Sequence, residues 1–209
     1  MNKTYCFGTD GGCLDSFYLF KELFPKKEIF FLSNSHHKDE KLFGTHVKGP
    51  FEYVEKITNN SNFIYQCGSV SNHKQRDFWF NKAIDYGLIP LSLISKFAYI
   101  HPTAQIGEGS IIYPGVKIMT NVKIGKNTII LPNAVVNHDS VIGDFSIINS
   151  SCVINGSVSI GKKFFLGSSS SIREKTNISK KVTIGMNSMI LNNITSEGTY
   201  IGIPAKRKI

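Results

Sequence analysis

The adjacent pair His138 and Asp139 is the best candidate for chemistry in this sequence. Imidazole titrates closer to neutral pH than any other side chain, so His138 could accept a proton from a reacting group. Neighbouring residues on a strand tend to point to opposite faces, so a contact between the two side chains would need a corner in the backbone. The alternative is a surface histidine beside a surface aspartate, with no chemical role.

The other candidates compete poorly. The serine run 168–171 lacks the Gly-x-Ser-x-Gly pattern of a nucleophile elbow. The four cysteines show no paired spacing, which predicts free thiols and a reducing compartment. The remaining histidines suggest no metal cluster, and we expect no metal site. They are His36, His37, His46, His73 and His101.

A six-residue repeat is the element that must position His138. Ile, Leu or Val occupies every sixth position from Ile100 to Ile190 without interruption. The residue four places after each of these aliphatics is small or modestly apolar, as Ser140 is after Val136. This regularity indicates an internal repeat with two inward registers. His138 lies two places after Val136, outside both registers, so its side chain should face outward.

Glycines recur eighteen residues apart, so three hexads should make one coil; they are Gly107, Gly125, Gly143 and Gly161. Each hexad is expected to form a short strand and a corner, where glycine adopts conformations that other residues resist. About five coils at strand spacing would give a triangular prism on the order of 25 Å tall. A single coil cannot bury its inner face, so stability depends on stacking.

The non-repetitive first half predicts a separate domain, with a small Rossmann-like α/β domain at 1–97 and the repeat domain at 98–209. Strands are expected at 5–7, 29–32, 63–67 and 88–93, and helices after Gly12, at 51–57 and at 75–86. The last helix should place Phe78, Trp79 and Ile84 toward the sheet.

A glycine-rich turn, 8–13, joins the first strand to a helix. Amide groups at such a helix end can hold a phosphate, although the turn could equally be structural. Ligands of parallel sheets gather outside the carboxyl ends of the strands, so the ends of three strands should line one crevice. The expected substrate-binding residues are Gly8, Thr9, Asp10, Gly11, Gly12, Ser33, Asn34, Gly68 and Ser69.

The net charge of +9 is concentrated in the repeat. Residues 100–209 hold twelve Lys or Arg against five Asp or Glu. The basic residues are scattered around coil corners without the interleaved aromatics of single-strand binders, which disfavours a nucleic-acid partner. Anionic small molecules fit better. No apolar run is long enough to cross a membrane and no signal segment opens the chain, so we expect a cytoplasmic protein without a membrane partner.

The repeat resembles the left-handed parallel β-helix of the hexapeptide acyltransferases, and the segment 202–206 resembles the one that closes these helices. The stretch 137–145, preceded by a small α/β domain, resembles the bacterial sugar acetyltransferases of the bacillosamine, perosamine and sialic acid pathways. The resemblance implies acetyl-CoA as co-substrate, a nucleotide-linked amino sugar as acceptor, and a homotrimer with its active site between subunits. It makes His138 the general base and Asp139 the partner that orients it.

Acetyl-CoA contacts are implied at Ile147, Asn149, Gly156, Gly167, Gly185, Met186, Ala205 and Lys206. Gly12, Ser33, Asn34 and Ile147 depart from the family's usual residues. The expected activity is N-acetylation of a 4-amino-4,6-dideoxy type sugar for glycan or O-antigen synthesis. The alternatives are O-acetylation of a sugar such as sialic acid, and a β-helix that binds without catalysis.

Overall fold

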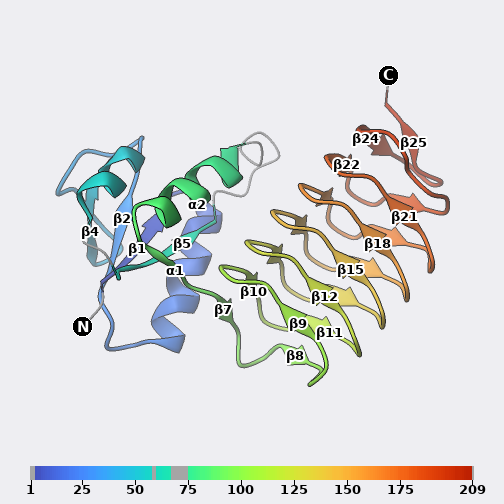
Figure 1. The fold of residues 1–209 in the computed structure, drawn as a ribbon, viewed down its shortest axis with the longest axis horizontal. Helices are drawn as coiled ribbons and strands as arrows, with labels where there is room; N and C mark the ends of the chain where they lie inside the picture. Colours follow the sequence, from blue (N-terminus) through green and yellow to red (C-terminus); the bar gives the residue numbers. More distant parts are fainter. Residues whose placement is uncertain (1–2, 58–59, 67–74, 209) are drawn as a thin grey trace. The chain divides into compact units, whose positions relative to one another are not determined.

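A computed structural model describes residues 3–57, 60–66 and 75–208 (Figure 1). The chain divides into two compact units, Met1–Leu93 and Ile94–Ile209. In Figure 1 the first unit, blue to green, is a sheet with helices, and the second, green to red, is a stack of coils. Within the described residues, no helix is long and apolar enough to cross a membrane.

The first unit is built on one sheet with the strand order β3-β4-β2-β1-β5-β6. Its pairs are parallel except for β3 with β4. The strands are β1 (Thr4–Phe7), β2 (Ile29–Leu32), β3 (Lys41–Leu42), β4 (Thr45–Gly49), β5 (Asn62–Tyr65) and β6 (Ile89–Pro90). The helices are α1 (Gly11–Leu23), the 3-10 helix η1 (Phe51–Lys56) and α2 (Arg76–Asp85). The central strand β1 is buried along its whole length, as expected of a strand with neighbours on both sides.

One helix face differs from the expectation. Phe78 is 58% exposed, whereas Trp79 and Phe80 are buried. Phe80 lies 5.2 Å from Phe63 of β5, ring centroid to ring centroid, so Phe80 packs against the sheet in place of Phe78. The expected strand over 88–93 is also broken into β6 and β7 (Leu93–Ile94).

The second unit is a parallel β-helix. Strand partners lie eighteen residues apart, as in the pairs Ile112 with Ile130 and Ile118 with Val136. Residues 93–208 form three ladders, ordered β25-β24-β22-β19-β16-β13-β10-β7, β23-β20-β17-β14-β11-β8 and β21-β18-β15-β12-β9. Both inward registers are buried from Val116 to Ile190, so the sequence pattern correctly predicted this core.

The strands of the coils are short, and almost all have two residues. They are β8 (Tyr99–Ile100), β9 (Gln105–Ile106), β10 (Ile111–Ile112), β11 (Lys117–Ile118), β12 (Lys123–Ile124), β13 (Ile129–Ile130), β14 (Val135–Val136), β15 (Val141–Ile142), β16 (Ile147–Ile148), β17 (Val153–Ile154), β18 (Ser159–Ile160), β19 (Phe165–Leu166), β20 (Ser171–Ile172), β21 (Asn177–Ile178), β22 (Val182–Ile184), β23 (Met189–Ile190), β24 (Gly198–Ile201) and β25 (Lys206–Arg207).

Serines of the small register satisfy backbone groups inside the corners. The Ser140 hydroxyl donates to the Asn155 carbonyl at 2.9 Å and accepts from the Val158 amide at 3.1 Å. Ser110 and Ser170 make equivalent contacts. A buried backbone group without a partner costs about as much as a lost hydrogen bond, so these hydroxyls stabilise each turn. Cys152 occupies the same register, and its burial raises the pKa of the thiol to about 11.

The reason for the corner glycines differs from the expected one. A Cβ on Gly143 would lie 2.5 Å from the Lys162 amide nitrogen of the next coil. Close approach between coils therefore requires glycine there. The left-handed backbone positions of the corners belong to a different series, which begins with Gly109 and Gly115 and continues with other residues, among them Asn121 at φ 57° and Asp139 at φ 59°. Asn and Asp tolerate this conformation better than most side chains.

We predict that Ile154→Ala lowers the free energy of unfolding by about 2–5 kcal/mol, because Ile154 is fully buried and truncation leaves a cavity between coils. The matched control is its strand neighbour Val153, which faces outward, and Val153→Ala should cost less than about 1 kcal/mol. Urea unfolding followed by circular dichroism measures both. Equal losses in the two variants would contradict the inward assignment.

Candidate functional site

His138 and Asp139 meet at a corner between β14 and β15. Nδ1 of His138 lies 2.8 Å from Oδ2 of Asp139. The left-handed backbone of Asp139 is the corner geometry that adjacent side chains need in order to meet. The two side chains are 63% and 51% exposed, so the pair faces outward. This part of the chain therefore presents an oriented imidazole on the surface of the β-helix.

The charge of Asp139 determines which ring nitrogen carries the proton. Its hydrogen bonds with His138 and with Asn121 lower the pKa of the Asp139 carboxyl, and His138 is the larger cause. An ionised carboxylate only accepts hydrogen bonds, so Nδ1 must be the donor. Nε2 of the neutral ring then keeps its lone pair. The arrangement can accept a proton at Nε2.

Gly156 lies beneath the ring, one coil further along. A Cβ at this position would lie 2.5 Å from both Cε1 and Nε2 of His138. The coils are joined here by a hydrogen bond from the Ser157 amide to the His138 carbonyl at 2.8 Å. The absence of a side chain at 156 therefore gives the imidazole room to lie against the backbone. The sequence resemblance placed Gly156 among the acetyl-CoA contacts. In the structure the side chain nearest to Gly156 is that of His138.

The other expected acetyl-CoA residues gather on a different corner. Asn149, Gly167 and Gly185 follow β16, β19 and β22, which are neighbours in one ladder. The Asn149 amide group donates to the Leu166 carbonyl at 2.7 Å. Gly167 is buried and Gly185 lies against the Ile201 side chain. Within residues 94–208 of one chain, this corner and the His138 corner are separate.

The end of the repeat presents a mixed surface beside this corner. Met186 is 79% exposed. Lys206 is exposed on β25, which pairs antiparallel with β24, and Ala205 packs against the core. Ile147 differs from these residues because it is only 2% exposed. Its side chain is therefore closed to a ligand in this conformation.

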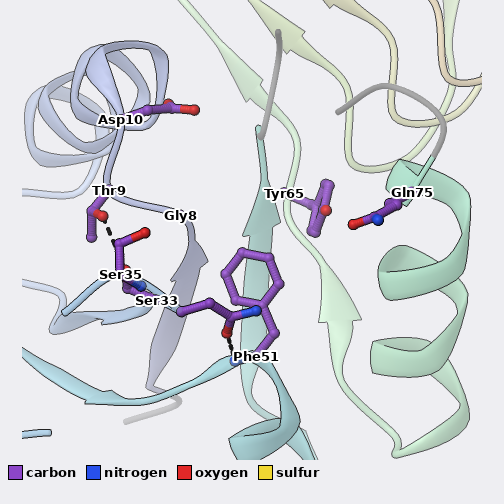
Figure 2. A pocket seen from close by; sticks show the side chains of 9 residues that line it. Gly8, Thr9, Asp10, Ser33, Ser35, Phe51, Tyr65 and Gln75 are labelled. Carbon is purple, nitrogen blue, oxygen red and sulfur yellow. Dashed lines mark hydrogen bonds between the residues drawn. The ribbon is translucent and has the colours of Figure 1, made fainter. Parts of the chain in front are cut away.

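A cavity of about 330 Å³ lies in the first unit, at the carboxyl ends of β1, β2 and β5 (Figure 2). The strand β1 pairs with β2 on one side and β5 on the other, so the chain changes direction across the sheet there. Such a switch point is where parallel sheets bind ligands. Five of the expected crevice residues line the cavity, namely Gly8, Thr9, Asp10, Ser33 and Asn34.

Hydrogen bonds fix the polar wall of this cavity. The Thr9 and Ser33 hydroxyls are 3.0 Å apart, and Oδ1 of Asn34 accepts from the Phe51 amide at 2.8 Å. In Figure 2, Thr9 and Asp10 lie to the left of the cavity and Tyr65 and Gln75 to the right. The wall thus combines hydroxyl, amide and carboxylate groups with the aromatic rings of Phe51 and Tyr65.

The helix end differs from the open phosphate site that the glycine-rich turn suggested. Asp10 caps α1, and its Oδ1 accepts from the Cys13 amide at 2.9 Å. This carboxylate takes an amide that an anion would otherwise use. Gly8 at φ 97° still needs glycine for the turn. A phosphate that entered this cavity would have to avoid Asp10.

The remaining expected residues of the crevice divide into two groups. Gly11 and Gly12 belong to the first turn of α1 and do not line the cavity, and Gly12 lies beside the Gln66 side chain. Gly68 and Ser69 lie outside the described residues.

Sequence reasoning missed four residues of the cavity wall, Ser35, Phe51, Tyr65 and Gln75. Tyr65 ends β5, so the rule about carboxyl ends of strands could have found it. Phe51 begins η1 and Gln75 is the N-cap of α2, so neither of them ends a strand. Across residues 3–57, 60–66 and 75–208, no group of three or more His, Cys, Asp or Glu side chains could hold a metal ion.

We predict that Gly156→Ala displaces the His138 ring, since the new methyl group would overlap Cε1 and Nε2. The ring signals of His138 in NMR spectra should shift, and the bond to Asp139 should weaken. Gly185→Ala is the control, because its methyl group would meet Ile201 instead. Unchanged His138 signals in Gly156→Ala would show that the ring does not lie over residue 156.

We also predict a pH-dependent contribution of Asp139 to stability. Its pKa is lowered in the folded state, so its charge stabilises the fold above the ordinary value of 3.8. This contribution disappears as the pH falls through the folded-state pKa. Asp139→Asn should therefore be slightly less stable than the wild type at neutral pH and equal to it in strong acid. Urea unfolding at a series of pH values tests this, and a constant difference would contradict it.

Comparison with known proteins places this geometry in a known fold. The acetyltransferase domain of PglB from Neisseria gonorrhoeae, in complex with acetyl coenzyme A, matches with a TM-score of 0.91 at 24% identity, covering 100% of both chains. A mutant perosamine N-acetyltransferase from Caulobacter crescentus, in complex with CoA and GDP-perosamine, matches with a TM-score of 0.90 at 20% identity, covering 100% of this chain and 97% of that one. WeeI from Acinetobacter baumannii gives 0.89 at 22% identity, with 100% of both chains covered.

These matches confirm the predicted fold of the repeat and are consistent with a left-handed β-helix. A comparison with curated protein sequences finds no match. Residues 90–198 match the family described as GMPPB C-terminal domain. Because this match spans half of the chain, the protein belongs to the GMPPB C-terminal domain family.

Proposed function

We propose that this protein transfers an acetyl group from acetyl-CoA to the amino group of a nucleotide-linked amino sugar. The observation that carries the proposal is the exposed His138 imidazole, held by Asp139 at 2.8 Å so that Nε2 keeps its lone pair. A group of this kind is what acyl transfer to an amine requires, because the amine must lose a proton. The solved structures with the same fold include complexes with acetyl coenzyme A and with CoA and GDP-perosamine.

In the proposed reaction the sugar amine attacks the thioester carbonyl, and a C–N bond forms. Nε2 of His138 takes the proton that the amine nitrogen loses. The C–S bond then breaks, and the proton on His138 passes to the sulfur, so CoA leaves as the thiol. Asp139 holds Nδ1–H throughout and stabilises the imidazolium that forms between the two proton transfers.

The acetyl-CoA slot is proposed along the corner that carries Asn149, Gly167 and Gly185, with Met186, Ala205 and Lys206 at its end. Gly156 lies at the other corner, beneath His138, and Ile147 is buried on β16, the strand that precedes Asn149. Within one chain this corner is separate from the His138 corner, so a complete site needs a second chain to bring the two corners together. We therefore propose a homotrimer with active sites between adjacent subunits, which size-exclusion chromatography with light scattering can test.

The first unit is proposed to be a Rossmann-like domain that binds the nucleotide end of the acceptor. The support is the cavity at the carboxyl ends of β1, β2 and β5, at the switch point of a mostly parallel sheet. Asp10, Ser33 and Asn34 offer hydrogen bonds to hydroxyl and base edges. Because Asp10 is a carboxylate, the diphosphate should bind on the side of the cavity away from it.

The test is thiol release from acetyl-CoA with a panel of UDP-, dTDP- and GDP-linked 4-amino sugars and free sialic acid. We predict turnover of at least one nucleotide amino sugar, and a loss of about 10²–10⁴-fold in kcat/KM for His138→Ala. His46→Ala, a surface histidine of β4, is the matched control and should keep full activity.

Other outcomes would point to a different function. Turnover of free sialic acid alone would indicate O-acetylation. Absence of turnover together with absence of acetyl-CoA binding by calorimetry would indicate a β-helix that binds without catalysis. Full activity of His138→Ala would remove the proposed base.

A further inference from the structure

The carboxylate of Asp139 is held at both oxygens. Oδ2 contacts Nδ1 of His138 at 2.8 Å, and Oδ1 accepts from Nδ2 of Asn121 at 3.0 Å. The two partners come from different coils, because Asn121 lies eighteen residues before Asp139 in the same corner column. The carboxylate cannot rotate without losing one of these bonds. Asn121 therefore limits the positions that Asp139 can offer to the imidazole.

Asn121 is itself fixed by its backbone. Its backbone N–H donates to Oγ1 of Thr103 at 2.8 Å. The carbonyl of the neighbouring Thr120 accepts from the backbone N–H of Asp139 at 2.9 Å. The residue has φ 57°, a left-handed conformation that asparagine tolerates. Because a carboxylate oxygen can only accept, the amide nitrogen of Asn121 must face Asp139. Its orientation is thus set from both sides.

We propose that Asn121 is a positioning residue for proton transfer by His138. The Asn121 side chain bonds to Oδ1 of Asp139 and not to Nε2 of His138, so it acts through the carboxylate of Asp139. Its hydrogen bond keeps that carboxylate facing Nδ1, which holds the ring in the tautomer with the proton on Nδ1. This inference rests on the proposed function for its kinetic consequence, whereas the tautomer can be measured without turnover.

A purely structural role for Asn121 would stabilise the corner without affecting the ring. Two substitutions separate the possibilities. Asn121→Gly removes the donor and keeps a residue that adopts positive φ readily. Asn121→Asp keeps the size and the backbone preference but places a second carboxylate beside Asp139, which repels it. Ser157→Gly is the matched control, because Ser157 occupies the same corner position as Asn121 two coils later, also at φ 57°.

The first measurement is the ring-nitrogen NMR spectrum of His138 in the full chain. In the wild type the proton of the neutral ring should reside on Nδ1. In Asn121→Gly the fraction of this tautomer should fall. In Asn121→Asp it should fall further, because the second carboxylate repels Asp139. Ser157→Gly should match the wild type. An unchanged tautomer in both Asn121 variants overturns the proposal, whatever the activity of the protein.

The second measurement is kinetic. In Asn121→Gly we expect kcat to fall about tenfold while KM stays within about twofold, because only the orientation of the base is affected. Asn121→Asp should lose more, and the acid limb of its pH profile should move to higher pH. A change in KM or thermal stability alone, or the same loss in Ser157→Gly, would overturn the proposal. A tautomer that shifts in the Asn121 variants of a protein without turnover would refute the proposed function and leave the positioning role of Asn121 standing.

Discussion

Stacking of coils with the same eighteen-residue register is the constraint on which the second unit depends. Each inward aliphatic is aligned with its equivalents one coil away, as Ile118 is with Ile100 and Val136, and all of them belong to one buried cluster or pack against it. The interior therefore admits no charged group without a large desolvation cost. Charged side chains are therefore confined to the outward positions, and the corners are where the backbone turns enough for neighbouring side chains to meet. His138 and Asp139 occupy such a corner.

The stacking also explains why contacts between residues distant in sequence follow one fixed spacing. Residues eighteen apart are vertical neighbours, so a corner residue interacts with the coil before and the coil after it. Asp139 bonds through its side chain to Asn121, and His138 lies over Gly156. A functional group in this fold thus has its environment set by two other positions of the same column. The first unit follows a different rule, because its cavity is assembled from the ends of separate strands and from loops.

Much of the fold could be predicted because one strong period dominates the second half. The outward direction of His138 and the burial of Ser140 and Cys152 follow from that period alone. The role of the corner glycines did not follow, since a one-dimensional pattern does not show how closely the coils approach. In the first unit, the rule about the carboxyl ends of strands pointed to Gly8, Ser33 and Asn34, and these three residues line the cavity.

Other features of the site could not be read from the sequence. Phe51 and Gln75 reach the cavity from the starts of η1 and α2, whose positions depend on tertiary packing. The Asp10 side chain could face either a ligand or the amides at the start of α1, and the glycine-rich turn permits both orientations. In the structure it caps the helix. The hydrogen bond between Asn121 and Asp139 could be predicted only by knowing that both residues occupy the same corner and that both have positive φ.

The eighteen-residue register has a consequence for insertions and deletions. Adding or removing one whole coil would leave every later residue on its original corner, so the fold tolerates growth in complete turns. Removing a single hexad would instead rotate all later positions by one face. The column of Asn149, Gly167 and Gly185 would then move to another edge relative to His138, although the aliphatic core would remain in phase. Length changes in this protein can therefore preserve folding completely while separating the groups that must act together.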